Sequence, residues 1–251
     1  MKGLPSHPNF LLQRWRFADG VPGATLGYCF WRRFLQVVFS GLWHVRVFNR
    51  QYEPAAGSAL YLCNHQSFLD PILMSMALKR PMNYMARETL FHIPGFKQLI
   101  VSVNAFPVKR NTADTGAMKE ALRRLKAGGQ LVVFPEGTRT RDGCIGPMLP
   151  GVAMLAQRAA DWTVPVVIDG AYECWPRTQM LPLPGFIAVA YGPPIPRDSI
   201  RGKEPHEFVT SVRRQLIDLQ ADLRRRLGRP EIRYPSEKLE PQRTQRTQRK
   251  N

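Results

Sequence analysis

Two short polar segments carry side chains suited to acid–base chemistry and to anion binding. The first, at residues 64–70, reads NHQSFLD and places an aspartate five residues after a histidine. A carboxylate can orient an imidazole ring, which then accepts a proton from a substrate hydroxyl. His65 and Asp70 are therefore predicted to be a general base and the group that positions it.

The second segment, at residues 134–139, reads FPEGTR and follows an apolar run. A guanidinium on a turn can hold a phosphate through two parallel hydrogen bonds, so Arg139 is the candidate phosphate clamp. The basic pair Lys109 and Arg110 offers weaker candidates for the same anion or for phosphates of a second substrate. Together the segments predict a substrate that bears both a hydroxyl and a phosphate.

In order and spacing these segments resemble the glycerolipid acyltransferases, the 1-acylglycerol-3-phosphate acyltransferases and their relatives. NHQSFLD fits the first family motif, Asn-His-x-x-x-x-Asp, and FPEGTR fits the third. FPVKR at 106–110 and VPVVI at 164–168 match the second and fourth motifs more loosely, and the similarity covers residues 59–170. One departure is MLPG at 148–151, where family members carry Phe-Lys-x-Gly. The missing lysine bears on the acceptor more than on the reaction.

The resemblance implies an O-acyltransferase that moves an acyl group from acyl-CoA or acyl carrier protein to the free hydroxyl of a lysophospholipid. The leading acceptor is 1-acyl-sn-glycerol-3-phosphate, which would give phosphatidic acid. The family uses neither a metal nor a bound organic cofactor. The resemblance also implies an acceptor site on one turn, formed by Glu136, Gly137, Thr138 and Arg139.

Alternatives to this assignment stay open. The acceptor could instead be glycerol-3-phosphate, another lysophospholipid or an amino-lipid, or the chain could be a non-catalytic basic lipid-binding protein. Asp70 also precedes Pro71, a common way to cap and begin a helix. Residues 135–138 could form an ordinary turn with Arg139 in solvent. The chemical interpretation is favoured because both segments occur in the right order.

Apolar runs and helical periodicity alternate along the chain and predict the elements that position these residues. Strands are expected at residues 59–63, 82–86, 104–108, 131–134 and 164–168, with helices between them. The predicted fold class is α/β, with a mostly parallel central sheet flanked by helices. Sites in such folds gather at the carboxyl ends of the strands. The candidates that follow such ends are His65, Lys109, Arg110 and Arg139.

The net charge of +17 is carried mainly by the two ends of the chain. Residues 1–50 hold seven Lys and Arg against one Asp or Glu, and residues 197–251 hold fifteen against eight. This excess favours anionic substrates and an anionic membrane surface as partners. No zinc-finger spacing, aromatic RNA-binding signature or helix-turn-helix accompanies it, so no specific nucleic acid is expected.

Residues 28–48 mix aromatic, aliphatic and arginine side chains without a long apolar run. This pattern favours an N-terminal amphipathic helical segment at the membrane interface, with a core helix as the alternative. We expect a membrane-associating segment at 1–50, an acyltransferase domain at 51–230 and a basic disordered tail at 231–251.

The four cysteines, which are far apart, form no Cys-x-x-Cys pair and predict reduced thiols. Cys63 beside the first segment is expected to be a buried strand residue rather than a nucleophile. Residues 1–9 lack the apolar core of a secretory signal. The expected location is the cytoplasmic face of a membrane, as a peripheral or monotopic protein.

Overall fold

A computed structural model describes residues 26–78, 80–93, 95–102, 104–109 and 114–234. Arg110, a predicted anion-binding residue, lies outside the described residues, as do residues 1–25 and most of the predicted disordered tail.

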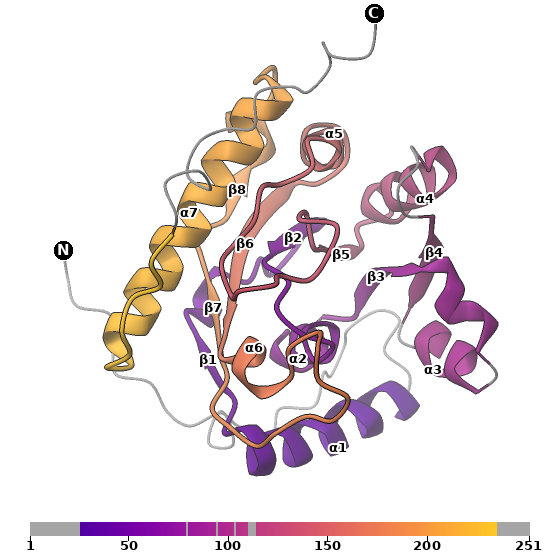
Figure 1. Ribbon diagram of the computed structural model, residues 1–251. Coiled ribbons are helices and arrows are strands. Elements are labelled where there is room, and N and C mark those ends of the chain that lie inside the picture. Colours follow the sequence, from indigo (N-terminus) through magenta and orange to yellow (C-terminus); the bar gives the residue numbers. More distant parts are fainter. Residues whose placement is uncertain (1–25, 79, 94, 103, 110–113, 235–251) are drawn as a thin grey trace, which may run out of the picture.

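A central sheet of eight strands organises the molecule (Figure 1). The strand order is β1-β7-β6-β2-β5-β3-β4, and β8 pairs with β6. Only the β6–β7 and β6–β8 pairs are antiparallel, which confirms the mostly parallel sheet. The strands are β1 (Arg46–Phe48), β2 (Ala59–Cys63), β3 (Met82–Arg87), β4 (Ala105–Val108), β5 (Gln130–Val133), β6 (Trp162–Asp169), β7 (Ala188–Tyr191) and β8 (Ile195–Pro196).

Helices and short turns connect these strands. The helices are α1 (Leu26–Trp43), α2 (Asp70–Ala77), α3 (Phe96–Ser102), α4 (Thr115–Lys126), α5 (Gly151–Arg158), α6 (Ala171–Cys174) and α7 (Pro205–Arg226). Three 3-10 turns are η1 (Arg50–Tyr52), η2 (Glu88–His92) and η3 (Arg197–Ser199). None of the helices in the described part of the chain combines the length and apolar composition needed to cross a bilayer.

The two faces of the sheet belong to separate cores. In β2, Leu60 and Leu62 pack into the core shared with α4, α5 and α7. Tyr61 and Cys63 point the other way, into the core shared with α1 and α2. All five residues of β2 are buried, as expected of a central strand covered on both faces. A strand held this firmly gives the loop at its end a fixed starting point.

Elements from both ends of the described chain join or cover the same sheet. The helical segment predicted for residues 28–48 ends at Trp43, because residues 46–48 form strand β1 instead. β1 pairs parallel with β7, bringing residue 46 beside residue 188. The apolar stripe of α7 is buried through Phe208, Val212 and Leu216, so this helix packs against the core. The domain boundaries themselves stay predictions.

Candidate active site

The two polar segments meet at the carboxyl edge of the sheet because β2 and β5 are parallel neighbours. His65 follows the end of β2 by two residues, and Phe134 directly follows β5. The His65 and Phe134 rings stack with centroids 4.2 Å apart and planes 21° apart. The Thr140 amide also donates to the His65 carbonyl at 2.8 Å. Residues far apart in the chain thus form one continuous site.

His65 and Asp70 form a close pair. Nδ1 of His65 lies 2.7 Å from Oδ2 of Asp70, whose side chain is completely buried. When Nδ1–H of a neutral ring donates to this carboxylate, Nε2 keeps its lone pair. The imidazole is therefore oriented to accept a proton. His65 as a whole is 8% exposed.

The Asp70 carboxylate also shapes the loop that carries the histidine. Its Oδ2 accepts hydrogen bonds from the backbone amides of Gln66 at 2.6 Å and Ser67 at 2.8 Å. Asp70 begins α2, as the Asp-Pro pair predicted, but the capping role was wrong. Leu69 holds the cap position without a side-chain hydrogen bond, because the Asp70 carboxylate turns back toward the loop instead.

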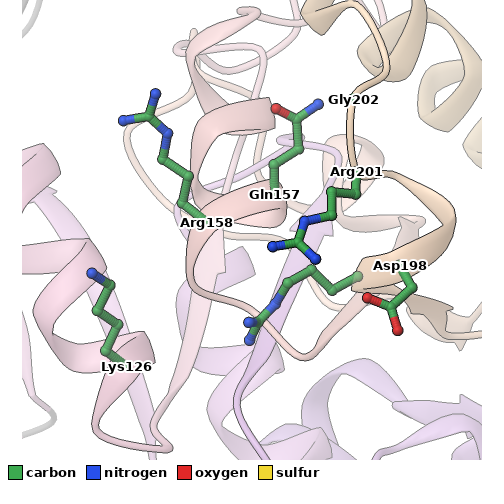
Figure 2. Close-up of a pocket in the computed structure, with 7 residues that line it drawn as sticks. Lys126, Gln157, Arg158, Asp198, Arg201 and Gly202 are labelled. Carbon is green, nitrogen blue, oxygen red and sulfur yellow. The ribbon is translucent and has the colours of Figure 1, made fainter.

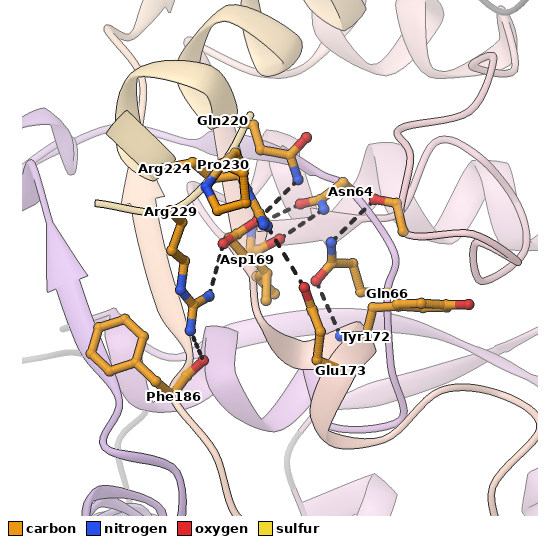
Figure 3. A network of polar contacts seen from close by, with 12 residues as sticks. Asn64, Gln66, Asp169, Tyr172, Glu173, Phe186, Gln220, Arg224, Arg229 and Pro230 are labelled. Carbon is orange, nitrogen blue, oxygen red and sulfur yellow. Dashed lines mark hydrogen bonds and ion pairs between the residues drawn. The ribbon is translucent and has the colours of Figure 1, made fainter. Parts of the chain in front are cut away.

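Asn64 and Gln66 fix the same loop to neighbouring segments (Figure 3). The Asn64 amide donates to the Ile168 carbonyl at 2.9 Å and accepts from the Ile168 amide at 2.8 Å. Gln66 donates to the Gly143 carbonyl at 3.3 Å and accepts from the Tyr172 amide at 3.2 Å. Both side chains are buried and bonded to backbone, so they position His65 from either side.

A buried charge cluster holds the adjacent end of β6 (Figure 3). Asp169 is fully buried and accepts hydrogen bonds from Arg224 at 2.8 Å, Arg229 at 3.1 Å and Gln220 at 3.3 Å. Buried charges need such paired partners. The cluster fastens the C-terminal part of α7 beside Ile168, the residue to which Asn64 is bonded.

Glu136 joins the histidine loop to the segment after the FPEGTR turn. Its Oε1 accepts from the His65 amide and its Oε2 from the Gly146 amide, each at 2.8 Å. Burial raises the pKa of Glu136 to about 7, although these two hydrogen bonds act to lower it. Its position is that of a bridge between two loops, with both carboxylate oxygens bonded to backbone.

The turn at 137–139 presents the candidate clamp. Gly137 has a φ of +71°, and a Cβ there would lie 3.0 Å from a methyl carbon of Leu149, so glycine suits the position. Thr138 is exposed. The guanidinium carbon of Arg139 lies 3.4 Å from the centroid of the Phe68 ring, on the loop between His65 and Asp70. The structure therefore brings the predicted base and the predicted clamp to one place.

Phe68 and Trp175 are site residues that sequence reasoning missed. Their ring centroids are 5.1 Å apart, and the Ser67 hydroxyl donates to the Trp175 carbonyl at 2.8 Å. An aromatic ring can support a guanidinium through a cation–π contact. The aromatic residue at position 68 was a visible signal, whereas nothing local linked residue 175 to it.

Lys109 lies farther from the pair. It follows β4, and β3 separates β4 from β5 in the sheet. Its ammonium is 4.0 Å from the Glu88 carboxylate, and 64% of its side chain is exposed. The strand order thus sets Lys109 two strand positions away from Arg139.

The remaining groups near the site include no described metal cluster. In residues 26–234, apart from the gaps in the description, no three His, Cys, Asp or Glu side chains are grouped to hold an ion. Cys63 is fully buried, and burial raises the pKa of its thiol well above the usual value. Cys63 is the buried strand residue that was expected. A thiol that stays protonated is also a poor nucleophile.

Comparisons with known proteins point to one family. The family model described as Acyltransferase matches residues 44–169. A 1-acyl-sn-glycerol-3-phosphate acyltransferase of Cocos nucifera is 28% identical over 163 residues, which cover 64% of this chain and 53% of the relative. The chain thus spans about half the length of that relative. One from Bacillus subtilis (strain 168) is 29% identical over 144 residues, 57% of this chain and 71% of the relative.

A solved structure has a similar fold. The 1-acyl-sn-glycerophosphate (LPA) acyltransferase PlsC from Thermotoga maritima matches with a TM-score of 0.65 and 27% identity. The match covers 76% of this chain and 78% of that one. The family match spans half of the chain and includes both NHQSFLD and FPEGTR. From these matches and the shared fold, the chain belongs to the acyltransferase family.

Proposed function

We propose that this protein transfers an acyl group from a thioester to the free hydroxyl of 1-acyl-sn-glycerol-3-phosphate. The observation that supports this most directly is that a candidate general base and a candidate phosphate-binding group lie close together. A histidine oriented by a buried carboxylate and an arginine stacked on the same loop lie at one sheet edge. The names of the relatives agree with that substrate.

In the proposed reaction, Nε2 of His65 removes the hydroxyl proton as the oxygen attacks the thioester carbonyl. A new C–O ester bond forms and the C–S bond breaks, releasing a thiolate that takes the proton from the imidazolium. Asp70 keeps the ring in the required tautomer throughout. No acyl-enzyme is needed, because the acceptor oxygen is itself the nucleophile.

Arg139 is proposed to bind the acceptor phosphate, since a planar guanidinium can hold it by paired hydrogen bonds. Gly137 and Thr138 would shape the same site, while Glu136 would hold the turn against the histidine loop. Lys109 and Arg110 remain candidates for binding the phosphates of the donor, acyl-CoA or acyl carrier protein.

We further propose that the part of residues 28–48 that lies on α1 contacts the cytoplasmic face of an anionic membrane. On α1, Phe30 is 65% exposed, Phe34 49% and Val37 51%, at helical spacing. Such a stripe is suited to an interface between headgroups and acyl chains.

A second acceptor deserves a direct test because of Leu149. This residue stands where the family carries lysine and is 57% exposed, and its amide donates to the Pro135 carbonyl of the FPEGTR turn at 2.8 Å. One cation fewer next to the turn that carries Arg139 would suit a headgroup with less negative charge, such as a phosphodiester lysophospholipid.

The test is a panel of acceptors with one labelled acyl donor. Lysophosphatidate should give the highest kcat/KM, and its product should be phosphatidic acid. Higher turnover of a lysophosphodiester or of glycerol-3-phosphate would reassign the acceptor. Absence of transfer to any acceptor, with the folded protein and both donor types, would reject the enzymatic proposal.

A further inference from the structure

The exposed large apolar side chains are concentrated on one edge of the molecule. Among the described residues, eleven such side chains are between 46 and 89% exposed. Four lie on α1, and the other seven lie in connections that follow the carboxyl ends of β2, β3, β5 and β6. These connections begin at the catalytic edge of the sheet. Patches of this kind on a folded protein mark an interaction site.

The loop at residues 176–184, between α6 and β7, carries three of these side chains, including the two most exposed. Met180 is 89% exposed, Leu181 72% and Leu183 51%. The sequence of the loop, PRTQMLPLP, contains one arginine and no acidic residue. Apolar side chains with a basic neighbour match the chemistry of an anionic bilayer surface.

This loop is fastened to the C-terminal end of α1. The Trp43 indole donates to the Leu183 carbonyl at 2.7 Å, and the Gly185 amide donates to the Leu42 carbonyl at 3.2 Å. Figure 1 shows the connection between α6 and β7 running past α1. The stripe of α1 and the 176–184 loop therefore form one surface held in a fixed relation.

The base of the loop reaches the candidate active site. Trp175 contacts Phe68, and the Arg139 guanidinium stacks on the Phe68 ring. A headgroup at the level of the loop would therefore approach Arg139 from the membrane side. The opposite edge is different in kind: its cavity of about 510 Å³ is lined by polar and basic residues such as Arg158 and Arg201 (Figure 2).

We propose that the 176–184 loop is a second membrane anchor, which inserts Met180, Leu181 and Leu183 into an anionic bilayer beside α1. The inference about the bilayer rests on the apolar surface and its charge. Only the direction in which the acceptor arrives depends on the proposed function.

Site-specific fluorescence tests the insertion directly. An environment-sensitive dye is attached at Leu181→Cys in a Cys29→Ser background, since Cys63, Cys144 and Cys174 are buried. Vesicles of phosphatidylglycerol and phosphatidylcholine should shift its emission to the blue. The matched control carries the dye at Arg201→Cys, on the opposite edge, and should show no shift.

A binding measurement checks the contribution of the loop. The double variant Met180→Ser with Leu181→Ser should lower partition onto the same vesicles about tenfold or more, because two apolar side chains no longer leave water. Thr178→Ala changes a polar residue of the same loop and should bind like the wild type. Unchanged unfolding temperatures for both variants would show that the fold is intact.

Several outcomes would overturn the proposal. These are a dye at residue 181 that stays unshifted with vesicles, and a double variant that partitions like the wild type. Emission already blue without vesicles would indicate another occupant. If this blue shift increases with protein concentration, the occupant is a second copy of the protein. If the shift does not depend on concentration, the occupant is the chain's own residues 1–25. The vesicle experiments contain no acyl donor, so they report lipid contact even if acyl transfer to lysophosphatidate fails.

Discussion

Positively charged side chains lie at both edges of the sheet, but the residues next to them differ. At the carboxyl edge, Arg139 stacks on Phe68, next to the His65–Asp70 pair. At the amino edge, the cavity has more cations and no histidine (Figure 2). The residues that line it are Lys126, Gln157, Arg158, Arg197, Asp198, Arg201 and Gly202.

The number of positive charges at an edge therefore does not indicate where the catalytic site lies. At the amino edge, Arg197 already bonds to Asp161 and to the Ala160 carbonyl. Of the described histidines, only His65 has a carboxylate within ion-pair distance. One cation beside an oriented base can serve a reaction, whereas several cations without a base can only bind an anion.

The largest expected effect comes from removing the base at the carboxyl edge. His65→Ala should lower kcat/KM by a factor of about a hundred to ten thousand, the usual range for a general base. Steady-state acyl transfer with lysophosphatidate measures this change. His206→Ala removes an exposed histidine on α7 and should leave the rate unchanged. Retained turnover in folded His65→Ala would show that the carboxyl edge does not supply a catalytic base through His65.

Arg139→Ala should have the next largest effect, mainly on the KM for lysophosphatidate. Loss of charge-assisted hydrogen bonds predicts a rise of roughly 10–100-fold with a smaller change in kcat. Initial rates over a range of acceptor concentrations give both constants. Arg139→Lys should recover part of the loss, because it restores charge without the planar fork. An unaltered KM in Arg139→Ala would exclude the clamp.

Glu136 should make stability depend on pH. Burial raises its pKa from 4.5 to about 7, so the folded state holds a proton there that the unfolded state has released. As pH rises between these values, the wild type should lose about 1–3 kcal/mol of unfolding free energy relative to Glu136→Gln. Denaturant unfolding at pH 5, 6, 7 and 8 measures this difference, since other groups titrate in both proteins. Parallel pH curves would contradict the shift.

The smallest effect is expected at the amino edge. Arg158→Ala and Arg201→Ala remove exposed cations from the cavity without touching the His65 loop. Surface charges of this kind contribute little, so kcat and KM for lysophosphatidate should stay within about twofold of wild type. A loss as large as that of Arg139→Ala would move the acceptor site to the other edge.

The features that sequence predicted are those set by local pattern. Apolar runs at 59–63 and 164–168 correspond to β2 and β6, because strands buried on both faces need continuous apolar residues. The spacing of His65 and Asp70 spans a single loop, so their contact could also be expected. The position of Arg139 followed from the rule that parallel strands end at the same edge.

The features that sequence did not predict depend on contacts between distant segments. Asp169 pairs with Arg224 and Arg229, fifty-five and sixty residues later. Lys109 also follows a parallel strand, yet strand order, which the edge rule does not specify, sets it apart from Arg139. Asn64 was visible as part of a motif, but its bonds to Ile168 required knowing that β2 and β6 are neighbours.

If His65 and Arg139 act on one lipid, an acceptor without a phosphate should react without help from Arg139. The measurement is kcat/KM of the wild type and Arg139→Ala, with lysophosphatidate and with monoacylglycerol. Arg139→Ala should lose roughly 10–100-fold with lysophosphatidate and almost nothing with monoacylglycerol, because only the first offers the clamp a phosphate. Equal losses with both acceptors would show that Arg139 does not bind the acceptor phosphate.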